Sequence, residues 1–247
     1  MLWKKKNKLP ITENDKIWVD EDLDWLRYEI GKENFMEILT VTPTKEFYER
    51  EFDGSEIDAE FILNRTMELM NINDVEIKLD FFSDGVVEME DGTTLISPAD
   101  IHGKWKSTAG TYEMKDNEIV ISLERQQLKD PISLIATISH ELSHQILLGE
   151  NRIEENDEYL TDLTAINYGF GIFIGNSRFK FSQYLSNSEF GWQSSTQGYL
   201  PEQIIAYAMA WLSIERNEGI NYSKFLKPSL KKYFEQSYKY LTTQLDK

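Results

Sequence analysis

The sequence predicts an α+β fold in which a small sheet comes first and helices follow. Apolar and polar residues alternate over Val75–Phe81 and again over Ile119–Leu123, as in strands with one buried face. From Asp130 onward the apolar residues instead recur every three or four positions, which is the period of an amphipathic helix. Strands followed by a run of helices are typical of the α+β class.

Length, charge and composition exclude several classes of protein. The 247 residues suffice for one large domain or two small ones, and their composition is that of an ordinary globular protein. The net charge of −17 argues against nucleic acid as a partner, because phosphate binding needs a basic surface. The absence of cysteine excludes disulfides, thiolate metal sites and cysteine nucleophiles. With no secretory signal and no apolar stretch of ~20 residues, we expect a cytoplasmic protein without a membrane partner.

Several local features are expected before the helical half of the chain. Residues 1–35 are charged, and we expect an irregular segment that packs on the body through Trp3, Trp18 and Trp25. Ile38–Thr42 is expected to be a strand. Ser55 and Asp58 form a start signal for a helix. The apolar face of this helix would be formed by Ile57, Phe61, Ile62, Leu69 and Met70. Thr111–Met114 is the expected hairpin partner of the second alternating strand.

Four helices are expected from Asp130 to the end of the chain. Pro131 suits the first position of a helix. The apolar face of this helix consists of Leu134, Ile135, Ile138, Leu142, Ile146 and Leu147. A second helix is expected over Glu154–Phe173, and residues 176–200 form an aromatic, serine-rich connector. Two more helices are expected to begin near Pro201 and Pro228.

One motif within the first of these helices carries chemistry. His140-Glu141-Leu142-Ser143-His144 is an H-E-x-x-H motif, whose two histidines are four residues apart and therefore share one helix face. Two imidazoles placed in this way reach one Zn²⁺ ion at ~2.0–2.1 Å. Glu141 lies about 100° around the helix from His140, beside the metal, where its carboxylate can take a proton from a zinc-bound water. The motif therefore predicts one Zn²⁺ per chain.

A catalytic zinc site needs a third protein ligand, and here it must be a carboxylate, because no further histidine lies nearby. Glu158 and Asp162 of the second helix are four residues apart, on a face that continues through the small residues Ala165 and Gly169. Small residues would let the two helices lie close together. Glu158 is the better third ligand, and Asp162 would then accept a hydrogen bond from a ligating imidazole. The alternative is Asp162 as the ligand. The earlier acidic residues, Glu154 and Glu155, are expected to be solvated at the start of the helix.

H-E-x-x-H followed by Glu158-Tyr159-Leu160-Thr161-Asp162, an E-x-x-x-D motif, resembles the gluzincin branch of the zinc metallopeptidases. The match covers roughly residues 75–175, and the 13 residues between the motifs are typical of compact members. The resemblance implies a zincin-like fold, in which a small mixed or antiparallel sheet packs on an active-site helix and a second ligand helix, followed by C-terminal helices. It also implies that the last strand presents an antiparallel edge to the peptide. Ile119–Leu123 or Thr111–Met114 would be that edge.

The resemblance also implies the role of each site residue. The zinc ligands would be His140, His144 and Glu158, with Glu141 as the general base and Asp162 supporting a histidine. Many members of the family also use a further histidine or tyrosine to stabilise the oxyanion. In this chain the candidates for that role are Tyr168, Tyr199 and Tyr207. His102 is expected to be a loop histidine, and the connector 176–200 to supply part of the substrate pocket.

The expected function is therefore that of a zinc metallopeptidase, a hydrolase acting on peptide or protein substrates. Two alternatives come from other classes: a zinc-binding regulatory or scaffold protein that does not cleave, and a metal-dependent hydrolase of a non-peptide amide. The expected division of the chain has three parts. Residues 1–35 pack on the body, 36–175 form the zincin-like catalytic domain, and 176–247 add the connector and C-terminal helices to the same globule.

Overall fold

The computed structural model describes residues 8–73, 75–82, 86–88, 94–96, 110–115, 118–177 and 200–245. Within these ranges the chain is mostly helical and carries a small sheet, which confirms the predicted α+β class. The helices are α1 (Glu13–Ile30), α2 (Lys32–Glu37), α3 (Glu56–Leu69), α4 (Pro131–His144), α5 (Glu158–Ala165), α7 (Glu202–Glu215) and α8 (Pro228–Leu245). The strands are β1 (Ile77–Phe82), β2 (Val86–Glu88), β3 (Thr94–Ile96), β4 (Gly110–Lys115) and β5 (Glu118–Glu124).

β5 is the inner strand of a three-stranded mixed sheet with the order β1-β5-β4. It runs parallel to β1, with Ile77 opposite Ile119, and antiparallel to β4, with Thr111 opposite Ser122. The predicted hairpin is therefore confirmed. Of the two strands expected to offer a free edge, only β4 is an outer strand of this sheet, because β5 is paired on both sides. β2 and β3 form a separate antiparallel pair.

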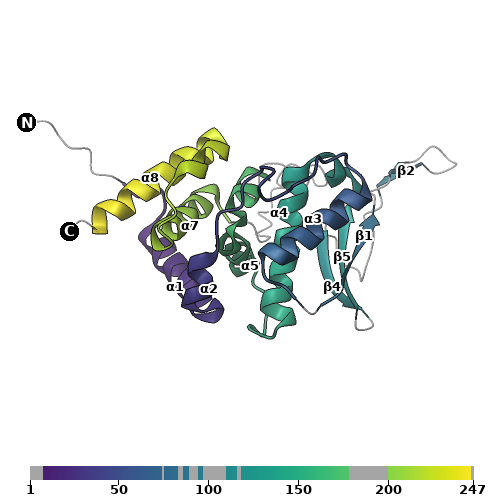
Figure 1. Ribbon diagram of the computed structural model, residues 1–247, viewed down its shortest axis with the longest axis horizontal. Coiled ribbons are helices and arrows are strands. Elements are labelled where there is room, and N and C mark those ends of the chain that lie inside the picture. Colours follow the sequence, from purple (N-terminus) through teal and green to yellow (C-terminus); the bar gives the residue numbers. More distant parts are fainter. Residues whose placement is uncertain are drawn as a thin grey trace, which may run out of the picture.

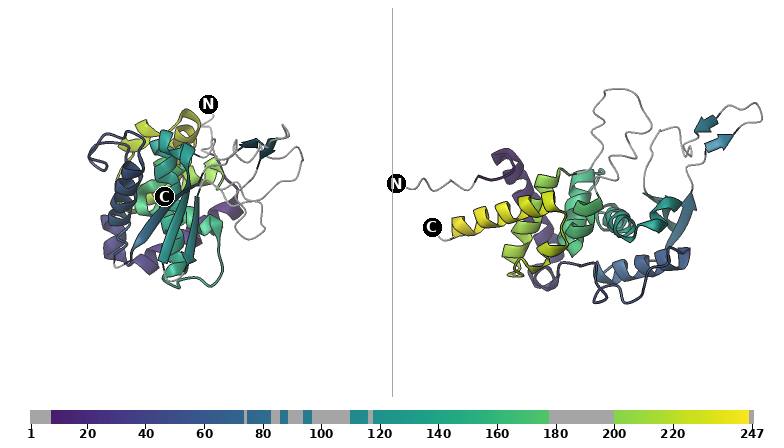
Figure 2. Two further views of the ribbon diagram at one scale, coloured as in Figure 1. Left: turned by 90° about the vertical axis from the view of Figure 1, so that its right-hand side faces the viewer. Right: turned by 90° about the horizontal axis from the view of Figure 1, so that it is seen from above.

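The motif helix α4 lies in the middle of the molecule (Figure 1). It contacts β4, α3 and α5, whereas α7 and α8 pack on each other and α1 packs against both α5 and α7. Figures 1 and 2 show the sheet at one end of the molecule and α1, α7 and α8 at the other. This arrangement places α4 and α5 at the junction between the sheet and the helical end.

The N-terminal segment is helical, so the prediction of an irregular segment at 1–35 is wrong for its described part. Thr12 caps α1 in a capping box, in which its hydroxyl accepts a hydrogen bond from the amide of Asp15 and the Asp15 carboxylate accepts one from the amide of Thr12. The buried stripe of α1 is narrow and consists of Val19, Leu23 and Leu26. Trp18 and Trp25 do pack against the core, as expected, and Trp3 lies outside the described residues.

The predicted strand at Ile38–Thr42 is not found among the described strands. The amide of Val41 donates to the carbonyl of Gly169 at 3.0 Å, and the amide and hydroxyl of Thr40 donate to the carboxylate of Glu218. Gly169 has a φ of 96° and breaks the helical path after α5, and a Cβ there would overlap the carbonyl oxygen of Leu39. Gly169 therefore makes room for this segment, and not for α4 as its spacing from Glu158 had indicated.

Both helices of the predicted site pass directly into a π-helical turn. α4 continues as Gln145–Gly149, and α5 as Ile166–Phe170 followed by helical residues 171–177. The second helix starts at Glu158, later than predicted, because Asp157 is its N-cap and accepts hydrogen bonds from the amides of Tyr159 and Leu160. A π-helical turn contains an extra residue, so positions beyond it leave the face that an α-helical spacing assigns to them.

The other predicted helices agree with the structure. α3 begins after Ser55, whose hydroxyl accepts a hydrogen bond from the amide of Asp58. α7 begins directly after Pro201, and α8 begins at Pro228. Ile57, assigned to the apolar face of α3, is instead 67% exposed. The connector 176–200 lies outside the described residues apart from its ends, so its predicted role in a substrate pocket stays a prediction. Among the described helices, none has the length and apolar character needed to cross a membrane.

Candidate metal centre

α4 brings the H-E-x-x-H motif into a buried position. Pro131 occupies the first turn, where its missing N–H is not needed, and every residue from Ser133 to His144 is buried. His140, Glu141 and His144 are 8%, 6% and 7% exposed, respectively. Three ionisable groups in so apolar a helix are costly to bury unless they have partners. The partners of the two histidines come from α5.

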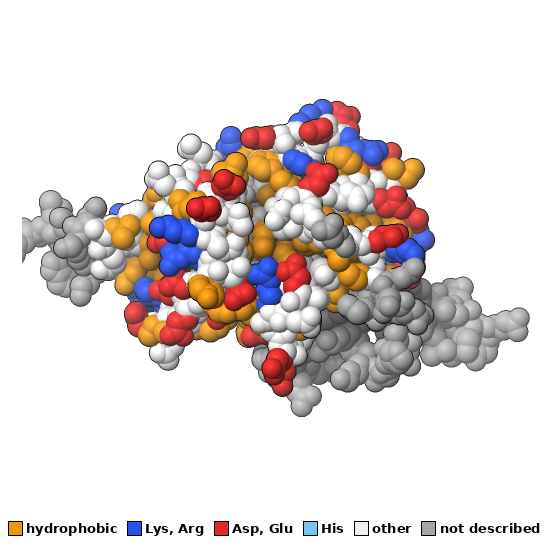
Figure 3. Space-filling view, turned by 60° about the horizontal axis from the view of Figure 1, so that its bottom comes forward, with side chains coloured by type: hydrophobic (Ala, Val, Ile, Leu, Met, Phe, Trp, Pro, Cys, Tyr) orange, Lys and Arg blue, Asp and Glu red, His pale blue; other side chains and the backbone are white. Residues whose placement is uncertain are grey.

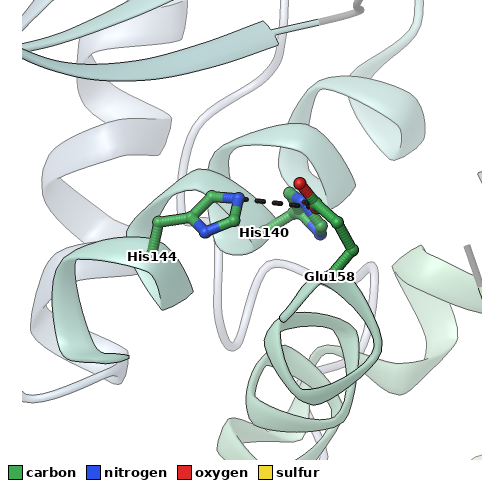
Figure 4. A group of neighbouring side chains, drawn as sticks. All are labelled: His140, His144 and Glu158. Atoms are coloured by element: carbon green, nitrogen blue, oxygen red, sulfur yellow. Dashed lines mark hydrogen bonds and ion pairs between the residues drawn. The ribbon is translucent and has the colours of Figure 1, made fainter. Parts of the chain in front are cut away.

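Glu158, the first residue of α5, lies against the Nε2 atoms of both histidines (Figure 4). Its Oε2 is 3.2 Å from Nε2 of His140 and 3.7 Å from Nε2 of His144. The two imidazole rings are perpendicular, with centroids 4.9 Å apart. One ligand atom from each of the three residues lies within 4.8 Å of the others, which makes the group able to hold a metal ion.

The donor set and the two separations from Glu158 suit a metal ion. Two imidazole nitrogens and one carboxylate oxygen are the ligands of many catalytic zinc sites. Bonds of ~2.0–2.1 Å at a tetrahedral angle separate neighbouring ligand atoms by about 3.4 Å. The two distances from Glu158 to the histidines, 3.2 and 3.7 Å, lie on either side of that value.

Asp162 holds the other nitrogen of His140. The Nδ1–H of His140 donates to Oδ1 of Asp162 at 2.8 Å, and Oδ2 accepts a hydrogen bond from the amide of Leu200 at 3.0 Å. Asp162 is 1% exposed. A carboxylate only accepts hydrogen bonds, so this contact fixes the proton on Nδ1 and turns Nε2 toward Glu158 and His144. Glu158 and Asp162 thus lie on opposite nitrogens of His140.

Two polar side chains at the site were not singled out from the sequence. The hydroxyl of Thr161 is 3.4 Å from Nδ1 of His144 and donates to the carbonyl of Asp157 at 2.7 Å. Its lone pair is therefore free to accept from His144. The amide of Asn156 donates to Oε1 of Glu158 at 2.9 Å. The signal for Thr161 was available, because it lies three residues after Glu158 and shares its helix face.

The acidic neighbours perturb the titration of the site. Burial by itself lowers the pKa of His140, but the hydrogen bonds to Asp162 and Glu158 outweigh it and hold the pKa well above its usual value. The hydrogen bond to His140 lowers the pKa of Glu158 to about 2, against the opposing effect of burial. Glu141 also acts on His140 through its negative charge. The carboxylates therefore favour a cation between them.

Tyr112 of β4 links the outer strand of the sheet to the end of the motif helix. Its ring centroid is 6.3 Å from that of His144, and its hydroxyl donates to Oε1 of Gln145 at 2.6 Å. The sequence alone did not point to Tyr112, because its closeness to His144 depends on the pairing of β4 with β5. Of the three tyrosines proposed to stabilise the oxyanion, two have other contacts and the third is not among the described residues. Tyr207 donates to Asp20 of α1, Tyr168 lines a separate cavity, and Tyr199 and His102 are outside the described residues.

The site is thus a buried group of two histidines and one glutamate, carried by two neighbouring helices and suited to a metal ion. Comparison with protein-family models, with curated proteins and with solved structures finds no match for the chain. The chemistry of the site therefore has to be argued from its own residues.

Proposed function

We propose that the protein is a zinc-dependent metallopeptidase of the gluzincin type, with a zincin-like fold. The proposal is carried by one observation: Glu158 faces Nε2 of both motif histidines, while Asp162 holds Nδ1 of His140. This is the division of roles that the H-E-x-x-H and E-x-x-x-D motifs predict for a metal site. His140, His144 and Glu158 would hold one Zn²⁺, and Asp162 would orient His140.

Glu141 is the general base of the proposed reaction. Zinc, when bound by the three ligands, supplies a Lewis acid that polarises the scissile carbonyl and makes water more acidic. Glu141 follows His140 directly in the buried helix and accepts the proton of the attacking water. The same carboxyl then returns the proton to the leaving nitrogen as the C–N bond breaks. Glu141 thus acts first as the general base and then as the general acid.

The position of β4 supports a peptide as the substrate. β4 is an outer strand of the described sheet and contacts α4, and its Tyr112 lies beside His144. An extended peptide adds to such an edge through main-chain hydrogen bonds, which suits substrates of varied sequence. A peptide bound along β4 would run past the end of the motif helix.

The test is digestion of a peptide library by the zinc-loaded protein, followed by mass spectrometry, with and without a chelator. We expect cleavage that the chelator abolishes and added Zn²⁺ restores. Glu141→Gln should keep zinc at the wild-type ratio and lose at least about 100-fold in turnover, the low end of general acid–base effects. Glu154→Gln, the same change at an exposed position before α5, should leave turnover unchanged.

Full activity of the Glu141→Gln variant would contradict the mechanism. A zinc-loaded wild type that leaves every peptide intact would contradict the peptidase assignment. Hydrolysis of small non-peptide amides by that protein would then identify it as an amide hydrolase, and no turnover of either kind would favour a zinc-binding scaffold.

A further inference from the structure

A cavity lies beside the turns that follow the two ligand-bearing helices. Its volume is about 430 Å³, and it is bounded by α1, α2, the segment after α2 and the end of α3. Ile146, from the turn after α4, and Tyr168, from the turn after α5, both line it. None of the three proposed metal ligands is part of its lining. The cavity is therefore distinct from the candidate metal centre.

Apolar and polar groups line the cavity in about equal measure. The apolar lining includes Ile38, Val41 and Met70. Tyr168 is only 8% exposed, and its hydroxyl forms no hydrogen bond with any described residue. The hydroxyl oxygen itself is not sealed from solvent, so it is accessible to a molecule in the cavity. Its volume falls in the range of roughly 300–1,000 Å³ that small-molecule sites have.

The charge around the cavity favours a cation. Three glutamates line it, Glu29, Glu37 and Glu150, against a single cation, Arg152. Arg152 is already paired, with Glu150 at 2.8 Å and with Glu29 at 3.7 Å. The lining therefore has an excess of two negative charges, carried formally by its carboxylates. Figure 3, which brings the bottom of Figure 1 forward, shows hydrophobic side chains interspersed with acidic and basic ones on this face.

We propose that this cavity binds a small amphipathic cation, an alkyl or aryl primary amine. The apolar body of the amine would fill the space beside Ile38, Val41 and Met70. Its ammonium group has three N–H donors, for which the Tyr168 hydroxyl and the glutamates at the cavity provide acceptors. An anion of the same shape would meet the excess negative charge. The site is defined independently of the proposed peptidase activity.

The probe is n-hexylamine, compared with 1-hexanol and hexanoate as neutral and anionic molecules of the same length. Binding to the zinc-loaded protein is measured by isothermal titration calorimetry at pH 7. We expect hexylamine to bind, hexanol to bind more weakly, and hexanoate not to bind. Equal binding of hexylamine and hexanoate, or no binding of hexylamine up to ~10 mM, the weak end of the range for small ligands, would overturn the proposal.

Variants distinguish this cavity from the metal centre, where an amine could also bind. Glu37→Gln should weaken hexylamine binding by about two- to five-fold, as expected for one exposed charge. Glu33→Gln, the same change on the same short helix but outside the lining, should have no effect. Tyr168→Phe should weaken binding further without changing the metal content. Binding that is unchanged in both Glu37→Gln and Tyr168→Phe would place the amine elsewhere and contradict the proposal.

Discussion

Asp162 holds His140 by its Nδ1 atom at 2.8 Å and is itself held by the amide of Leu200 at 3.0 Å. The two carboxylate oxygens thus have different partners, one from the motif helix and one from the chain just before α7. This arrangement fixes the ring of His140 before any metal arrives. Preorganised ligands of this kind lose less freedom on binding a metal ion.

Asp162→Asn should weaken metal binding. The single remaining carbonyl oxygen can accept from His140 or from Leu200 but not from both, and the new NH₂ group opposes whichever donor it faces. We expect the affinity for Zn²⁺ to fall by about 10–100-fold, the usual effect of losing the partner of a ligating histidine. A competition titration with a chromophoric chelator measures it. Asp157→Asn is the matched control on the same helix, because asparagine caps α5 as well as aspartate does and should leave the affinity unchanged.

Glu158→Gln should reduce metal binding more than Asp162→Asn does. The change removes the negative charge that faces both Nε2 atoms, so the loss should exceed the about 10–100-fold effect of a supporting residue. Metal content after dialysis, measured by mass spectrometry of the metal, reports it. Glu154→Gln should retain the wild-type metal content. A Glu158→Gln variant that retains full metal content would exclude Glu158 as a ligand.

Asp22→Asn should stabilise the protein at neutral pH but not in acid. Burial, together with the charges of Asp157 and Glu21, raises the pKa of Asp22 to about 6 from 3.8. The folded state therefore holds a proton more tightly than the unfolded state, so stability is highest below pH 3.8 and is lost as the pH rises through 6. Asp22 is half-buried, and water screens its charge, so we expect a gain of about 1 kcal/mol at pH 7. Thermal unfolding at pH 7 and pH 4 measures it, and an equal gain at both values would contradict the assignment.

Gly169→Ala should destabilise the fold far more than Gly31→Ala. Both glycines have a positive φ, 96° and 85°, a backbone conformation that costs an alanine about 1–3 kcal/mol by itself. A Cβ at Gly31 meets no atom within 4 Å, whereas one at Gly169 overlaps the backbone carbonyl of Leu39. We expect a loss in unfolding free energy of about 1–3 kcal/mol for Gly31→Ala, from the backbone alone, and a loss about 2 kcal/mol larger or more for Gly169→Ala, because of the overlap. Urea denaturation measures both, and similar losses would mean that the segment after α2 yields easily.

The elements that the sequence predicted well are those whose signals are local. The apolar spacing from Leu134 to Leu142 and Pro131 defined α4, and the alternation in β1 and β5 defined both strands. α1 was missed because only three of its eighteen residues are buried, and its best signal was the capping box at Thr12. Ile38–Thr42 has the composition of a strand, but strand pairing is a tertiary property that composition does not determine.

The part of the site that lies on the two helices could be predicted from helix geometry. His140, His144 and Glu158 come together as the motif spacing indicated, because each lies within an unbroken α-helical stretch. Gly169 was misplaced because its positive φ breaks the helix within the turn after α5. Tyr112 reaches His144 from the sheet and Leu200 reaches Asp162 from 38 residues away, and neither contact has a local signal.

The contact between Asp162 and Leu200 also bears on how the protein matures during its synthesis. At 5–20 residues per second, 38 residues correspond to roughly 2–8 s of translation. For that interval the nascent chain already carries both histidines and Glu158, but the carboxylate behind His140 still lacks its backbone donor. A metal ion captured early would therefore bind a looser version of the site. Full affinity would arrive only when Leu200, just before α7, has been added.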